Sequence, residues 1–324
     1  MSSPRTLSGK TVFLLLLPIL AYYAGMMAQK NQIPLDTEDL PSEEFLIPIS
    51  YTEQSPEINR AELVMKALAA AYPGRVGSAE FRDGDWAVPL AGKWYYYAEG
   101  RILPEERKDQ VSQYSALPFY NYIAELPEWT PPSPELAARM SDPRRSVSNR
   151  PSYFFDDLWR SRDQDEAWDR TKTIYFLNHR VMVHQGILMP LSLVEEQILK
   201  EARTSSAVRQ WIDSLDTVVS WGWRNIASSE NRSFHSYGIA IDILPRVTRG
   251  QEVYWLWTSQ YNPEWWNVPY SRRYHPPDEV IRAFESFGFI WGGKWLTYDT
   301  MHFEYRPEVL ILNDIPMADL RSLP

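Results

Sequence analysis

The side chains that could bind a metal ion are few, because the chain has five histidines and no cysteine. A metal ion would therefore have to be held by imidazole and carboxylate groups, and a cysteine nucleophile is excluded. The helical His-Glu-x-x-His zinc motif is absent, as are the G-x-S-x-G and S-x-x-K motifs of serine hydrolases. Any metal chemistry must use histidines that are spread along the chain.

The first candidate segment is SFHSYGIAID, in which His235 precedes Gly238 and a strand of alternating residues that ends at Asp242. Glycine permits the tight bend between histidine and strand. Ile239 and Ile241 share the face of the strand that can pack inward, and Asp242 lies on the opposite face. The spacing therefore allows His235 and Asp242 to converge on one ion.

The second candidate segment is WGGKWLTYDTMHFEY, residues 291–305, in which a Gly-Gly turn precedes a strand that carries His302. Facing residues on neighbouring strands have Cβ atoms about 4.5–5.5 Å apart. Placing this strand beside the strand of Asp242 would bring His302 to the same ion as His235. Two histidines and one carboxylate leave a coordination position open for water, which is the arrangement of catalytic zinc sites.

Hydrolysis at such a site also needs a carboxylate that takes a proton from the attacking water. Asp299 is expected in the loop just before the strand, and Glu304 shares the ligand face of the strand with His302. Spacing favours Asp299 as the base and leaves Glu304 as the alternative.

Two further residues are candidates for contact with substrate. Arg224 follows a strand candidate over 218–223, and its guanidinium could bind a substrate carboxylate through two hydrogen bonds or stabilise an oxyanion. Ser233 could donate a hydrogen bond to substrate, or its hydroxyl could stabilise the turn. Four tryptophans could line a cleft for peptide or glycan, although core packing is the favoured role for at least half of them: Trp265, Trp266, Trp291 and Trp295.

The helices and strands expected around these residues indicate an α+β fold. Its sheet is small and mainly antiparallel, and the zinc site lies in a cleft on this sheet. His184 is expected to be structural, His179 to lie in a turn with Asn178, and both His179 and His275 to be exposed. Apolar periodicity and breaker residues predict helices over 57–72, 190–203, 206–215 and 277–287, and strands over 86–103, 173–177, 181–184, 217–223, 238–244, 289–291 and 300–305.

The N-terminal segment predicts export from the cytoplasm. Arg5 and Lys10 precede an apolar run over residues 11–28, which is the layout of a secretory signal, or of an uncleaved membrane anchor given its length. We expect a signal or anchor (1–28), a linker (29–56), a region of unknown role (57–150) and a catalytic domain (151–324). The net charge of −9 argues against a nucleic-acid partner, and the oligomeric state stays open.

Together the two segments resemble the zinc D-alanyl-D-alanine carboxypeptidases and the related L-alanyl-D-glutamate endopeptidases, the VanY-like group. That family has the pattern S-x-H-x-x-G-x-A-x-D and later an acidic residue shortly before a final histidine, and the resemblance covers about residues 170–310. It implies zinc on His235, Asp242 and His302, Asp299 rather than Glu304 as the base, and Arg224 as the substrate anchor.

The resemblance also implies a fold of the hedgehog/D-Ala-D-Ala peptidase type and a function. The expected enzyme cuts peptide bonds in bacterial peptidoglycan stem peptides and works in the cell envelope. Many members have glutamate where this chain has Asp299, and aspartate fits a subgroup with a Gly-Gly-x-Trp lead-in, so carboxypeptidase and endopeptidase activity both stay open. The alternative from another class is a non-catalytic, zinc-containing module that binds the cell wall or has a structural role.

Overall fold

The structure is a computed structural model that describes residues 60–141, 149–226 and 229–318. The predicted signal or anchor (1–28) and linker (29–56) lie outside the described residues. All described residues fall within one compact unit, Asp39–Pro324. Within the described ranges, no helix has the length and apolar character needed to span a membrane.

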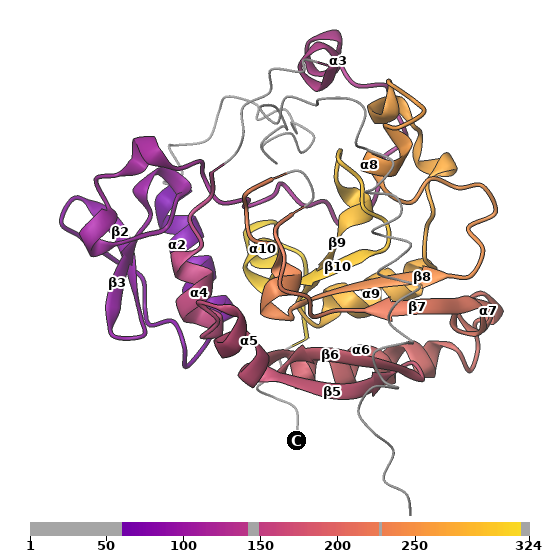
Figure 1. Cartoon of the computed structure of the whole chain (residues 1–324), viewed down its shortest axis with the longest axis horizontal. Coiled ribbons are helices and arrows are strands. Elements are labelled where there is room, and N and C mark those ends of the chain that lie inside the picture. The colour runs from indigo at the N-terminus through magenta and orange to yellow at the C-terminus, as the bar shows by residue number, and fades with distance from the viewer. Residues whose placement is uncertain (1–59, 142–148, 227–228, 319–324) are drawn as a thin grey trace, which may run out of the picture. The chain divides into compact units, whose positions relative to one another are not determined.

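Three antiparallel sheets and a set of short helices make up the described part of the chain (Figure 1). The predicted α+β class with mainly antiparallel strands is confirmed. The strands are β1 (Glu80–Arg82), β2 (Asp85–Leu90), β3 (Lys93–Tyr96), β4 (Leu103–Pro104), β5 (Thr171–Phe176), β6 (His179–His184), β7 (Leu215–Val219), β8 (Ala240–Pro245), β9 (Phe289–Trp291) and β10 (His302–Tyr305). The α-helices are α2 (Arg60–Ala71), α3 (Pro134–Ser141), α4 (Tyr153–Trp159), α5 (Gln164–Arg170), α6 (Leu188–Glu201), α7 (Ser206–Ser214), α8 (Trp255–Thr258), α9 (Asp278–Ser286) and α10 (Pro307–Leu312).

The central sheet has the strand order β7-β8-β10-β9, so that β10, the last strand in sequence, lies between β8 and β9. In the register of β8 with β10, His302 faces Asp242 and Phe303 faces Ile241. The ring of Phe303 stacks on Phe284 of α9 with centroids 4.0 Å apart. Because side chains alternate along a strand, this packing leaves His302 and Asp242 on the opposite face of the sheet.

The hairpin of β5 and β6 turns one residue earlier than the sequence predicts. Leu177 and Asn178 both have positive φ, 48° and 66°, as the two central residues of a tight hairpin turn of this kind require. His179 is therefore the first residue of β6, paired with Phe176, and it is half-buried rather than exposed. The prediction that His179 lies in the turn and is exposed was wrong.

Strand β7 is also shorter than predicted, because the chain leaves the sheet after Val219. The backbone N–H of Trp221 donates to the carbonyl of Met182 in β6 at 2.9 Å. This contact with β6 takes the segment that ends at Arg224 out of the β7–β8 ladder and toward the turn that holds His235.

Residues of the N-terminal region share one hydrophobic core with the central sheet. One buried cluster contains Leu68 of α2, Tyr72 just after it and Val88 of β2, together with Ile241 and Phe303 of the central sheet. The described part of the N-terminal region, from residue 64 to 117, therefore packs directly into the core that supports β8 and β10.

Gly238, next to the candidate site, combines a left-handed backbone conformation with close packing against the chain. Its φ is 71°, and an added Cβ would lie 2.9 Å from the backbone nitrogen of His184, which itself donates to the Gly238 carbonyl at 2.8 Å. Gly250 has a similar φ of 77°, but nothing lies within 4 Å of an added Cβ there.

We expect Gly238→Ala to destabilise the protein more than Gly250→Ala. Both variants carry the cost of a left-handed conformation, about 1–2 kcal/mol, and only the first also pushes on the backbone of β6. Urea unfolding of the two variants measures the difference in the free energy of unfolding. Equal losses would show that the backbone contact at His184 is not a constraint.

Candidate metal centre

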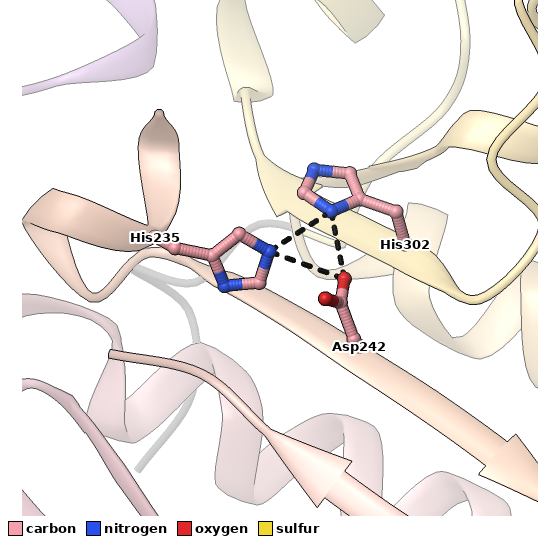
Figure 2. Close-up of side chains that lie close together, drawn as sticks. All are labelled: His235, Asp242 and His302. Atoms are coloured by element: carbon pink, nitrogen blue, oxygen red, sulfur yellow. Dashed lines mark hydrogen bonds and ion pairs between the residues drawn. The ribbon is translucent and has the colours of Figure 1, made fainter. Parts of the chain in front are cut away.

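Three side chains from two segments of the chain converge on the face of the central sheet opposite Phe303. Figure 2 shows the rings of His235 and His302 and the carboxylate of Asp242 pointing toward one another. The distances are 3.1 Å from His235 Nε2 to Asp242 Oδ1, 3.2 Å from His235 Nε2 to His302 Nδ1, and 2.9 Å from His302 Nδ1 to Asp242 Oδ1. All three residues are buried.

This spacing fits a single cation with tetrahedral preference. Zinc bonds to nitrogen and oxygen are about 2.0–2.1 Å long, so two ligand atoms at a tetrahedral corner angle lie about 3.3–3.4 Å apart. The observed separations are shorter by a few tenths of an ångström, and a small outward movement of the side chains would accommodate the ion. Two imidazoles and one carboxylate are also the donor set that zinc accepts. The role of these residues as ligands stays a prediction, and their geometry fits it.

His235 is held by a short 3₁₀ turn, η5 (Phe234–Tyr237), between two caps. The Ser233 hydroxyl accepts from the His235 backbone N–H at 3.3 Å, and Gly238 ends the turn in the left-handed conformation. The ring Nδ1 lies 2.7 Å from the carbonyl of Ser220. A proton on Nδ1 donated to this carbonyl leaves the Nε2 lone pair free to bind a metal ion.

His302 is oriented by a carboxylate on its own strand. Its Nε2 lies 3.2 Å from Glu304 Oε2, so a proton on Nε2 directs the Nδ1 lone pair toward Asp242 and His235. Glu304 is buried and its second oxygen is 3.4 Å from the guanidinium of Arg306. The sequence pattern had offered Glu304 as an alternative base, but both of its oxygens are engaged in supporting contacts. The i, i+2 spacing of His302 and Glu304 on one strand face was the signal for this pairing.

Buried charges set the protonation of the group. Burial lowers the pKa of His235, which keeps this imidazole neutral. Burial alone would also lower the pKa of His302, but hydrogen bonds to Asp242 and Glu304, and nearby carboxylate charges, raise it well above its ordinary value. Burial likewise opposes the ionisation of Asp242. The two histidines outweigh this effect, because their charges and their hydrogen bonds to the carboxylate lower its pKa. A cation that binds here therefore takes the place of the proton on His302.

Asp299 lies just before β10, where the sequence predicts it. Its backbone N–H donates to the carbonyl of Gly292 at 3.0 Å, and it pairs with Tyr254 in an isolated bridge. Among the described residues its Oδ1 is buried without a hydrogen-bond partner. Burial raises the pKa of Asp299 to about 7, and the charges of His302, Asp242 and Arg224 also act on it. An ionisable oxygen with an unused lone pair is what a general base requires.

Arg224 and Ser233 lie on the two sides of one short loop. The backbone of Arg224 is fixed by the Ser236 hydroxyl, which accepts from its N–H at 3.0 Å and donates to its carbonyl at 2.6 Å. Its guanidinium is half-exposed and lies 3.8 Å from Asp242 Oδ2. It is thus free to meet an incoming anion beside the three converging side chains. The Ser233 hydroxyl stabilises the turn of His235. This contact fits the predicted turn-stabilising role, and the predicted hydrogen bond to substrate stays a prediction.

The four tryptophans do not gather into one cleft wall. Trp265 and Trp266 pack with Tyr298 in one buried cluster, Trp291 belongs to the main core, and Trp295 lies in a third cluster. Only Trp295 approaches the candidate site, with its ring centroid 5.6 Å from that of His302. All four rings are buried in hydrophobic clusters, which is the core packing expected for at least half of them.

The remaining histidines lie away from the converging group. His184 is buried against Trp159, donates from Nε2 to the carbonyl of that residue at 2.9 Å, and accepts from Gly186 N–H at Nδ1. Burial lowers its pKa to about 4. His275 is exposed, as predicted, and its Nδ1 lies 2.6 Å from the carbonyl of Pro276.

Comparison with known proteins gives a match for two segments of the chain. The family model of D-alanyl-D-alanine carboxypeptidases matches residues 227–305, which contain His235, Asp242, Asp299 and His302. A domain of unknown function matches residues 64–119. No curated protein and no solved structure matches the chain. The first match supports a peptidase related to peptidoglycan metabolism at the level of the family, and it does not distinguish the VanY-like subgroup.

The raised pKa of Asp299 predicts how stability depends on pH. Because the folded pKa of about 7 exceeds the ordinary value of 3.8, the folded protein holds a proton that the unfolded chain releases. The contribution of this carboxyl is fully present below about pH 4 and is lost as the pH rises through about 7. Asp299→Asn removes this loss, so its melting temperature relative to the wild type should increase from pH 4 to pH 8. Thermal unfolding with a chelator present checks this, and a difference that does not vary with pH would contradict the burial of the charge.

Proposed function

We propose that this protein is a zinc-dependent peptidase that hydrolyses peptide bonds in bacterial peptidoglycan stem peptides. The observation that most supports this function is the convergence of His235, Asp242 and His302 within 3.2 Å of one another. The unpartnered Oδ1 of Asp299 and the family match over residues 227–305 agree with it.

The ion would be held by His235 Nε2, Asp242 Oδ1 and His302 Nδ1. When bound, zinc polarises a substrate carbonyl and lowers the pKa of water. The chain contributes the fixed orientation of its ligands through the Ser220 carbonyl and the Glu304 carboxylate. Such supporting contacts raise the basicity of histidine ligands and hold their rings in place.

Asp299 would move the proton during hydrolysis. Its carboxylate takes a proton from the water whose oxygen forms the new bond to the carbonyl carbon. It then delivers this proton to the amide nitrogen as the carbon–nitrogen bond breaks, which releases a carboxylic acid and an amine. A pKa of about 7 allows the same group to accept and return a proton near neutral pH.

Arg224 would bind a carboxylate of the substrate. Its half-exposed guanidinium already lies beside the carboxylate of Asp242, so an anionic substrate group can approach it without crossing the core. A planar guanidinium can hold a carboxylate through two parallel hydrogen bonds. Stem peptides carry free carboxylates, which suits both a carboxypeptidase and an endopeptidase.

The site of action would be the bacterial cell envelope, since peptidoglycan lies outside the cytoplasm. The basic residues Arg5 and Lys10 before the apolar run at 11–28 support export. Cell fractionation would check the location, and N-terminal sequencing of the exported protein would distinguish a cleaved signal from an anchor.

The zinc-loaded protein should release products from purified stem peptides, and mass spectrometry of the digest would name the bond that is cut. Asp299→Asn should keep its zinc and lose about 10²–10⁴-fold in rate, because only the proton transfer is removed. Full activity of this variant with zinc bound would contradict the assignment of the base. A wild-type protein that binds peptidoglycan and zinc without cleavage would favour the non-catalytic module instead.

Metal content provides a separate check of the ligand set. We expect one zinc ion per chain by elemental analysis, loss of activity with a chelator, and recovery on adding zinc. His235→Ala should lower the zinc content, whereas His275→Ala, at an exposed histidine away from the group, should leave it unchanged. Unchanged zinc in His235→Ala would contradict the ligand assignment.

A further inference from the structure

We propose that Tyr72, in the N-terminal region, is a positioning residue for the metal centre and acts through a buried chain of charged side chains that ends at His302. This inference rests on the proposed metal site. It assigns a role to the segment around residues 64–119, whose matching domain has no known function.

The chain of contacts begins at the carboxylate that orients His302. Glu304, which orients His302, is bonded at its Oε1 by Arg306 Nη1 at 3.4 Å. Arg306 is fully buried, and its Nε donates to Glu308 Oε1. Glu308 is also fully buried, and its Oε2 accepts from the hydroxyl of Tyr72 at 2.6 Å. A continuous series of polar contacts thus joins the end of α2 to the candidate ligand.

Arg306 is shared between two carboxylates, and its position depends on how each is satisfied. A guanidinium presents its donors in one rigid plane, so it cannot move toward Glu308 without changing its contact with Glu304. The Nη2 of Arg306 also donates to the carbonyl of Pro118 at 2.8 Å. Both Tyr72 and Pro118 lie in the segment of unknown function and bind opposite parts of this buried unit.

The Tyr72 hydroxyl supplies Glu308 with a neutral donor inside the core. Buried carboxylate oxygens need hydrogen-bond partners, because an unsatisfied buried charge is costly. Without this donor, Arg306 is the one side chain among the described residues that is left to satisfy Glu308, which would draw the guanidinium away from Glu304. Glu304 would then hold the Nε2–H of His302 less firmly, and the Nδ1 lone pair would lose its fixed direction.

Packing of the aromatic ring can be kept while the hydroxyl is removed. Tyr72 makes edge contacts with the rings of Trp159 and Tyr305, and phenylalanine retains them. Tyr96 offers a matched control, since its hydroxyl also donates to a carboxylate, that of Asp83 at 2.7 Å. Tyr96 belongs to the same N-terminal region but not to the series of contacts that reaches His302.

The test compares zinc affinity and the absorption spectrum of the cobalt-substituted full-length protein in the wild type, Tyr72→Phe and Tyr96→Phe. We expect Tyr72→Phe to lower zinc affinity about tenfold, at the low end of the 10–100-fold range for outer contacts to metal ligands. Its cobalt spectrum should shift, because the histidine ligand is held differently. Tyr96→Phe should match the wild type in both measurements.

The outcomes separate this inference from the proposed function. A purely structural role for Tyr72 would lower the melting temperature while leaving zinc affinity and the cobalt spectrum unchanged, and that result would overturn the inference. The same holds if Tyr96→Phe changes both measurements as much as Tyr72→Phe does. If the wild type itself binds no zinc, the metal site and this inference both fail. If the wild type binds zinc and Tyr72→Phe binds it equally well, only the inference fails.

Discussion

The antiparallel register between β8 and β10 is the constraint on which the candidate centre depends. It places Asp242 opposite His302 on one face and Ile241 opposite Phe303 on the other. A slip of β10 by one residue against β8 would turn His302 into the core and expose Phe303, while Asp242 kept its place. The burial of Phe303 against Phe284 therefore fixes the register, and the register fixes the distance between the two polar side chains.

The candidate centre and the charged side chains that follow it along the chain are all buried, which makes their charges interdependent. Asp242, His302, Glu304, Arg306 and Glu308 are all buried. Two charges taken out of water recover the cost of desolvation only when their geometry and their remaining hydrogen bonds are good. We expect such a group to contribute less to net stability than to a single defined arrangement, which the proposed metal site would need.

The sequence predicted the parts of this site that follow from alternation along strands. His302 and Asp242 could be placed on facing strands because each lies on the face opposite bulky apolar residues, and Asp299 could be placed in the loop before β10. The helices at 188–201 and 278–286 followed equally from their apolar spacing.

Other features depend on contacts between distant segments, and no local pattern indicates them. The partners of Glu308 and Arg306 include the Tyr72 hydroxyl and the Pro118 carbonyl, which only the folded core brings close. Core packing of tryptophans was expected, but their division among three separate buried clusters depends on the folded chain. The end of β7 at Val219 reflects a bond to the neighbouring hairpin, which competes with the strand propensity of the residues that follow.

The order of strands in the central sheet has a consequence for biosynthesis. Strand β10 is made after the other described strands, yet it pairs on both edges and lies between β8 and β9. A nascent chain that has not yet emerged beyond residue 301 lacks both the middle of this sheet and His302. Because such long-range pairing forms slowly, the three converging side chains can meet only after the whole stretch from His235 to His302 has left the ribosome.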